Sequence, residues 1–224
     1  MTIKTKVGQG QALAITELDN NFASLHEMVR GTGLPTKVGL DLSTPEWGWR
    51  DLTGVVSTSL SLLPPTAAVY LGGIRQRQFT VGDDSTIEFH IPHDYIPGTD
   101  LFIHAHWSHT SAGVTSGGVT WQFECMSAKG HNTDAFYTPV LISVTQAAST
   151  VRYQHMIAET QASAPASVAL LDTDWIDVDG LMVVTCRLTG NTMTGTPEPF
   201  LHSVDLHYQS SNRSTLNKAP NFYA

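Results

Sequence analysis

Apolar and polar residues alternate with a period of two along most of the chain from Leu52 onward. A period of two places successive side chains on opposite faces of an extended strand, so it predicts half-buried β-strands. The clearest predicted strands are 74–81, 86–91, 101–109, 119–126, 151–158, 181–189 and 200–209, and weaker candidates are 55–62, 67–71 and 140–144. Strands in this number, separated by loops rich in Gly and Pro, predict an all-β fold of the jelly-roll-like antiparallel β-sandwich type.

The composition favours strands and excludes some partners. Charged residues make up 14% of the 224 residues, against about 25% in an average soluble domain, so few are present to cover the solvent faces of helices. Twelve Lys and Arg against 20 Asp and Glu give a net charge of −8, which argues against nucleic acid as a partner. No apolar run approaches the roughly 20 residues of a membrane span, so no membrane partner is expected. Cys125 and Cys186 fall on apolar faces of predicted strands and are expected to be buried thiols.

A different period marks the N-terminal part of the chain. Apolar residues recur there at spacings of three and four, which predicts one amphipathic helix, with Thr16 as its N-cap and Gly31 at its end. A helix of about 14 residues is marginal alone in water, so its stripe must pack either on its own domain or on another chain. We predict that residues 1–44 form an anchor and oligomerisation segment and that residues 45–224 form the β-sandwich body. The expected anchor residues are Ile15, Leu18, Phe22, Leu25 and Val29.

Histidines cluster in the middle of the chain. Five of the ten histidines lie in the window 90–109, and the alternation over 101–109 places His104 and His106 on one face of a strand. Two imidazoles at positions i and i+2 can both reach one transition metal ion such as Fe or Zn. The remaining ligands are then expected from His90, His93 or Asp94.

Three interpretations of this cluster stay open. The spacing from Gly98 to His104 and His106 resembles the opening of the cupin metal motif, which implies a metal-dependent enzyme, but Thr110 and Ser111 stand where that motif has a glutamate. A structural metal ion is the second interpretation. In the third, the histidines make hydrogen bonds in loops or at a subunit contact, and no cofactor is bound.

Aromatic residues offer one further possibility. Aromatic rings stack on sugars, so a glycan-binding module is an alternative function, although aromatics in strands more often belong to a core or an interface. Complete catalytic motifs such as GxSxG or HExxH do not occur in the sequence. The aromatic candidates are Trp47, Trp49, Tyr95, Trp107 and Trp121.

Two parts of the sequence resemble virion structural proteins of tailed bacteriophages. Residues 13–25, with the string TELDNNF, resemble the short anchor helix that opens many fibre, appendage and neck-associated proteins. The blocks 45–52 and 89–100, the second reading FHIPHDYIPGTD, are similar to phage virion proteins, and the resemblance as a whole covers about residues 13–109. It implies a homotrimeric β-sandwich on a particle, bound to a neighbouring virion protein through its N-terminal segment. Some phage spikes bind iron through strands with a His-x-His pattern, and His104 and His106 match this pattern, so the resemblance also implies an iron site at these two residues.

Residues and resemblance together predict a non-enzymatic structural protein of a tailed-phage virion, of the fibre, appendage, neck-associated or decoration type. Its expected partners are copies of itself, as a homotrimer, and other virion proteins. Its expected location is the virion, after assembly in the host cytoplasm. No cofactor is required for this function. A cupin-like metalloenzyme and a glycan-binding module are the alternatives.

Overall fold

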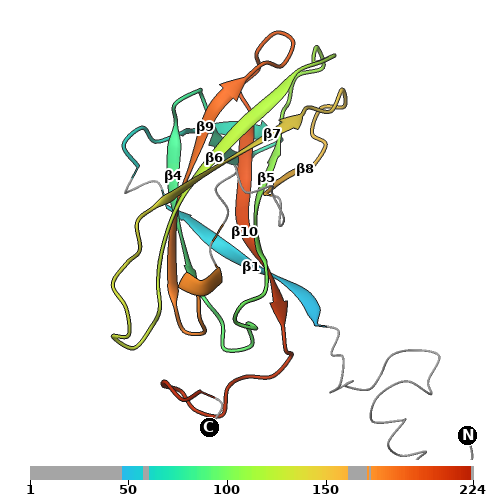
Figure 1. Cartoon of the computed structure of the whole chain (residues 1–224). Coiled ribbons are helices and arrows are strands. Elements are labelled where there is room, and N and C mark those ends of the chain that lie inside the picture. The colour runs from blue at the N-terminus through green and yellow to red at the C-terminus, as the bar shows by residue number, and fades with distance from the viewer. Residues whose placement is uncertain (1–46, 58–60, 161–170, 172, 223–224) are drawn as a thin grey trace, which may run out of the picture. The chain divides into compact units, whose positions relative to one another are not determined.

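Ten strands lie within the part of the chain that the structure, a computed structural model, describes (Figure 1). The described residues are 47–57, 61–160, 171 and 173–222. None of the helices in these ranges is long and apolar enough to cross a membrane. The strands are β1 (Gly48–Ser57), β2 (Thr66–Leu71), β3 (Ile74–Gln78), β4 (Asp84–His90), β5 (Leu101–Ser108), β6 (Gly118–Ala128), β7 (Val140–Ala147), β8 (Met156–Glu159), β9 (Leu181–Asn191) and β10 (Phe200–Ser210).

The predicted N-terminal helix lies outside the described residues. The same holds for the whole predicted anchor segment, residues 1–44. Its role therefore stays a prediction from the sequence. The anchor residues concerned are Ile15, Leu18, Phe22, Leu25 and Val29.

The strands form two antiparallel sheets, which confirms the predicted all-β sandwich. In sheet A the order is β8, β5, β10 and the first half of β1, and β3 with β2 joins the other end of β10. In sheet B the order is the second half of β1, then β4, β9, β6 and β7. With the β2–β3 hairpin set aside, β1-β10-β5-β8 facing β4-β9-β6-β7 is the strand order of a jelly roll.

Strand β1 passes from one sheet to the other at Gly54. Residues up to Gly54 pair with β10, and residues from Val55 pair with β4. A Cβ atom at Gly54 would lie 2.1 Å from Cγ2 of Ile87 and 2.6 Å from Cε1 of Phe89. Glycine is required here because the backbone passes directly over two buried side chains of β4.

The core lies between the two sheets. Strand β5 contributes Ile103, Ala105 and Trp107, all fully buried, while the side chains between them point to the outer face of sheet A. Sheet B contributes the buried thiols of Cys125 and Cys186, which are free, as the sequence predicts.

Two predicted strands are shorter than their alternation suggests. The range 151–158 is a strand only from Met156, because Ser149 accepts the backbone N–H of Val151 in a turn and Tyr153 has a left-handed φ of 62°. The range 74–81 is a strand only to Gln78, since Asp83 then accepts the N–H of Thr80 in a tight turn.

The FHIPHDYIPGTD block is a structural connection between β4 and β5. Asp94 accepts hydrogen bonds from the hydroxyls of Tyr208 (3.1 Å) and Ser210 (2.5 Å) and lies 3.0 Å from the guanidinium of Arg50. Tyr95 is fully buried, and burial raises its pKa to about 12. Through Asp94, the β4–β5 loop is therefore fixed to the start of β1 and the end of β10.

Candidate functional site

Cross-strand rows of polar side chains cover the outer face of sheet A. In one row, Asp51 of β1 lies opposite His207 of β10. In the next row, Asp205 of β10 lies opposite His104 of β5, which in turn lies opposite Glu159 of β8. Directly opposed residues of an antiparallel pair point to the same face. The register therefore gathers one surface, the histidine–carboxylate face, which comprises Asp51, His104, His106, Glu159, Asp205 and His207.

Each histidine of this face contacts a carboxylate from a neighbouring strand. Nε2 of His104 lies 2.5 Å from Oε2 of Glu159. Nε2 of His106 lies 3.1 Å from Oδ2 of Asp205, and Nε2 of His207 lies 3.8 Å from Oδ1 of Asp51. The Nε2 atoms of His104 and His106 are buried, yet neither is aligned for a hydrogen bond with another described residue. These contacts are therefore close approaches rather than aligned hydrogen bonds.

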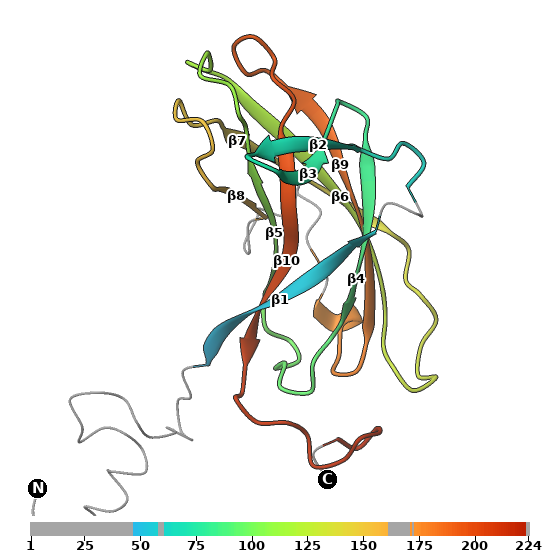
Figure 2. The same cartoon turned by 180° about the vertical axis from the view of Figure 1, so that it is seen from behind.

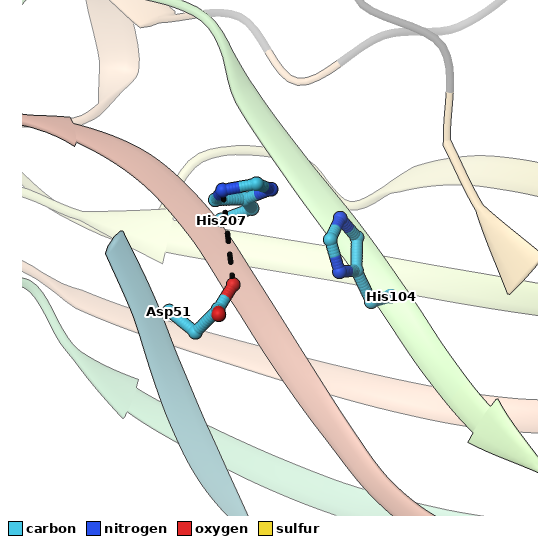
Figure 3. Close-up of side chains that lie close together, drawn as sticks. All are labelled: Asp51, His104 and His207. Carbon is cyan, nitrogen blue, oxygen red and sulfur yellow. Dashed lines mark ion pairs between the residues drawn. The ribbon is translucent and has the colours of Figure 1, made fainter. Parts of the chain in front are cut away.

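Three residues of the face converge on one point (Figure 3). Asp51, His104 and His207 each offer one ligand atom, and these atoms all lie within 4.8 Å of one another. The rings of His104 and His207 meet edge to face, with centroids 4.9 Å apart. Two imidazoles and a carboxylate at this separation are able to share a proton or a metal ion.

A second group of histidines continues the face toward the start of β10. The ring of His155 stacks on that of His106 and its Nε2 lies 2.7 Å from Nδ1 of His106. Nε2 of His202 lies 2.8 Å from the hydroxyl oxygen of Ser108. Burial lowers the pKa of His106, opposed by the negative charge of Asp205, and burial together with His155 and His106 lowers the pKa of His202. Both rings therefore favour the neutral form, in which one nitrogen keeps a free lone pair.

A shallow hollow opens beside the converging residues. It has a volume of about 160 Å³ and is lined by Trp49, Phe102, Glu159 and His207. The ring of Trp49 meets those of Phe102 and His207 edge to face at 5.3 Å and 5.0 Å between centroids. The hollow thus combines aromatic walls with a carboxylate, a combination that suits an amphipathic or hydroxylated ligand.

The structure separates the four histidines predicted as metal ligands into two places. The rings of His104 and His106 are neighbours, with centroids 6.0 Å apart, but they contact different carboxylates. His90 and His93 lie instead around Asp179, with Nε2 to Oδ1 distances of 2.9 Å and 3.5 Å.

The Asp179 cluster includes a third imidazole and the C-terminal segment. His131 contacts the other carboxylate oxygen of Asp179. Nδ1 of His93 lies 2.7 Å from the hydroxyl oxygen of Thr215, and Phe222 packs edge-on against His93 and His131. These contacts connect the end of β4 with the loops around residues 131 and 179.

Most of the proposed sugar-stacking aromatics belong to the core. Trp107, Trp121 and Tyr95 are fully buried and take no part in a surface site, as expected of aromatics that belong to a core. Trp49 is 45% exposed and lines the hollow. Phe102, which lines the hollow together with Trp49, was not predicted, because its place on the outer face depends on the strand pairing.

Several residues of the histidine–carboxylate face were not predicted as site residues from the sequence. Asp205 and His207 lie about 100 residues after the histidine window, and Asp51 lies before it. A signal was present in the D-x-H spacing of 205–207, which places both side chains on one face of a predicted strand. Only the β1-β10-β5 pairing shows that this face is the one carrying His104.

No protein-family model and no curated protein matches the sequence. Among solved structures, the chain is similar to the CBM22-1–GH10 modules of xylanase 10B from Clostridium thermocellum, solved with xylohexaose (12% identity, 76% of this chain, 28% of that chain, TM-score 0.34). It is also similar to the xylan-binding module CBM15 (9% identity, 73% of this chain, 97% of that chain, TM-score 0.33). A third similar structure is the stem and receptor-binding domain of spike protein P1 from bacteriophage PM2 (10% identity, 75% of this chain, 99% of that chain, TM-score 0.28). The chain spans only 28% of the xylanase chain. TM-scores of this size do not establish a shared function.

Proposed function

We propose that this chain is a non-enzymatic structural component of a tailed-phage virion, an oligomeric jelly roll that attaches to a neighbouring virion protein through residues 1–44. The observation that carries the proposal is an exposed apolar group on the β2–β3 hairpin. Val69, Leu71 and Ile74 are 59%, 52% and 60% exposed. Contiguous exposed apolar residues of this kind are typical of protein–protein contacts.

The hairpin presents this group because of how it packs on sheet A. Tyr70 points toward the sheet, where its ring meets Phe200 at 5.1 Å and its hydroxyl lies 2.8 Å from that of Ser108. Figure 2 shows the hairpin lying across β10. Since side chains alternate along a strand, Val69 and Leu71 face away from the sheet that Tyr70 covers. A second copy of the chain, in a trimer, is the occupant we propose for this surface.

The oligomer is tested by light-scattering mass measurement on the full chain. We expect the mass of three chains for the wild type and of one chain for the double variant Val69→Lys, Ile74→Lys. Leu141→Lys on β7 is the matched control, because Leu141 is also a strand residue, 52% exposed, and it should leave the mass unchanged. A monomeric wild type would overturn the oligomer proposal.

The virion role is tested separately through the anchor stripe. Replacing Phe22 and Leu25 with Asp places two charges in the apolar stripe, so we expect loss of the protein from purified particles, measured by mass spectrometry. The body should stay folded, as judged by its circular dichroism. Normal incorporation of the double variant would contradict the anchor proposal.

Glycan binding is a second candidate, favoured by the hollow lined by Trp49, Phe102, Glu159 and His207. Trp49 is exposed, whereas Trp107 and Trp121 are fully buried, so a sugar in the hollow should change the fluorescence of Trp49 and shield it from acrylamide. Titration with xylan and mannan oligosaccharides is the test. Shielding that persists in Trp49→Ala would place the ligand elsewhere.

A further inference from the structure

The point where Asp51, His104 and His207 converge is built by three neighbouring strands. Asp51 and His207 are direct partners across β1 and β10. His104 lies on β5, one row further along, and its ring reaches back to that of His207. Each side chain is therefore positioned by a strand of sheet A rather than by a loop, and the three ligand atoms lie within 4.8 Å of one another.

His104 supplies a second observation, which points to a ligand between this residue and Glu159. Only 6% of the residue and 8% of its side chain are exposed. Its Nε2 atom is inaccessible to solvent and has no aligned hydrogen-bond partner among the described residues, although Oε2 of Glu159 lies 2.5 Å away. Buried polar nitrogens in folded proteins almost always have a partner. A ligand that accepts the lone pair of this nitrogen would satisfy it.

We propose that Asp51, His104 and His207 bind one divalent transition metal ion, of which Zn²⁺ is the representative, with Glu159 as a fourth ligand. Two imidazoles with one or two carboxylates are a ligand set that suits Zn²⁺, Co²⁺ or Ni²⁺, whereas Ca²⁺ and Mg²⁺ prefer oxygen ligands alone. Zn–N and Zn–O bonds of about 2.0–2.2 Å bring ligands closer together than the present 4.8 Å limit. Binding would therefore require small side-chain rotations, and the exposed side chain of Asp51 has room to make them.

Glu159 is suited to complete the set. Its side chain is 48% exposed, so it is free to turn, and it already contacts His104. Glu159 and His207 also line the hollow, together with Trp49 and Phe102. The ion would therefore be reached from solvent through the hollow, and a chelator should remove it without unfolding the sandwich.

This site differs from a His104–His106 pair, and the two arrangements predict different variants. His106 contacts Asp205 and His155 instead of the converging point. Under our proposal His207→Ala abolishes the site and His106→Ala preserves it. Under pairing of His104 with His106, the reverse holds. The proposal is independent of the oligomer and of the virion role.

The test is titration of the full chain, stripped with EDTA, with Zn²⁺ by calorimetry and with Co²⁺ by visible absorption. We expect one site per chain that His104→Ala and His207→Ala each weaken by at least about 100-fold, because loss of a direct ligand exceeds the 10–100-fold effect of losing a residue that only orients a ligand. Asp51→Asn keeps one ligand oxygen but removes the charge, so it should weaken binding by about 10-fold or more. His106→Ala should stay within about threefold of the wild type.

Two further variants distinguish loss of the metal site from loss of the fold. Asp51 is exposed, so Asp51→Asn keeps the packing and tests the site even where His104→Ala unfolds the chain. His90→Ala removes a ring from the separate Asp179 cluster and should leave the Co²⁺ spectrum of the site unchanged. Absence of stoichiometric binding to the wild type would overturn the proposal. So would binding that survives Asp51→Asn and His207→Ala but is lost in His106→Ala.

Discussion

Asp205 lies directly across the β5–β10 ladder from His104, yet its carboxylate contacts His106, with Oδ2 3.1 Å from Nε2. The carboxylate of Asp205 thus contacts His106, in the neighbouring row, instead of its direct partner His104. His104 is left to Glu159 and to the converging pair Asp51 and His207. One face of sheet A therefore holds two distinct histidine–carboxylate groups side by side.

The Asp205–His106 contact should be coupled energetically. Both side chains are largely buried, with 12% and 15% exposed, so Asp205→Ala in the presence of EDTA should lower the free energy of unfolding by about 1–3 kcal/mol, since it leaves a buried nitrogen without its polar neighbour. A double-mutant cycle with His106→Ala, measured by urea unfolding, should give a coupling energy of about 0.5–3 kcal/mol. Asp205→Ala combined with His90→Ala is the control, and those two effects should add. Additivity in the first cycle would show that the contact contributes nothing.

Gly54 should tolerate no side chain. A methyl group there would overlap Ile87 and Phe89 of β4, with contacts as short as 2.1 Å. We expect Gly54→Ala to lower the free energy of unfolding by about 1–3 kcal/mol, the usual cost of overpacking a core. Gly73→Ala is the matched control, because a Cβ atom at Gly73 meets nothing within 4 Å. Equal urea midpoints for the two variants would contradict the steric role of Gly54 where β1 changes sheets.

The thiols should be inert in the folded protein. Cys125 and Cys186 are free and buried, and burial raises the pKa of Cys125 to about 12 and that of Cys186 as well. Since the thiolate is the reactive form, neither should react with Ellman's reagent at about pH 8, whereas both should react in denaturant. Rapid labelling of the native protein would show that the core between the sheets opens readily.

The fold was predictable because local alternation carries most of its information. The strands 101–109, 119–126 and 181–189 appear at nearly their expected positions, and each buries the face that its apolar residues mark. Turns were harder, since Ser149 and Tyr153 end a strand pattern through hydrogen bonds and a left-handed φ that the alternation does not reveal.

The candidate site was predictable only in part. His104 and His106 share a face by spacing alone, and the sequence does indicate that face. Asp51 and His207 become their neighbours through the β1–β10 and β5–β10 pairings, between segments about 150 and about 100 residues apart, which no local period encodes. The same reason separates His90 and His93, close in sequence to His104, into the Asp179 cluster.

Acidification should destabilise the fold through His202. Burial, with His155 and His106 nearby, lowers the pKa of His202 below its ordinary value of 6.5. Below about pH 6.5 the unfolded chain therefore binds a proton that the folded chain does not, so this contribution to stability is complete above pH 6.5 and declines as the pH falls toward the folded pKa. We expect His202→Gln, which keeps a polar group near Ser108 but does not titrate there, to unfold in urea with a weaker dependence on pH between about 7.5 and 5.5. The signal of His202 in an NMR titration, identified by its loss in the same variant, should give a pKa below 6.5. A pKa at or above 6.5 would contradict the burial of its ring between Tyr70 and β5.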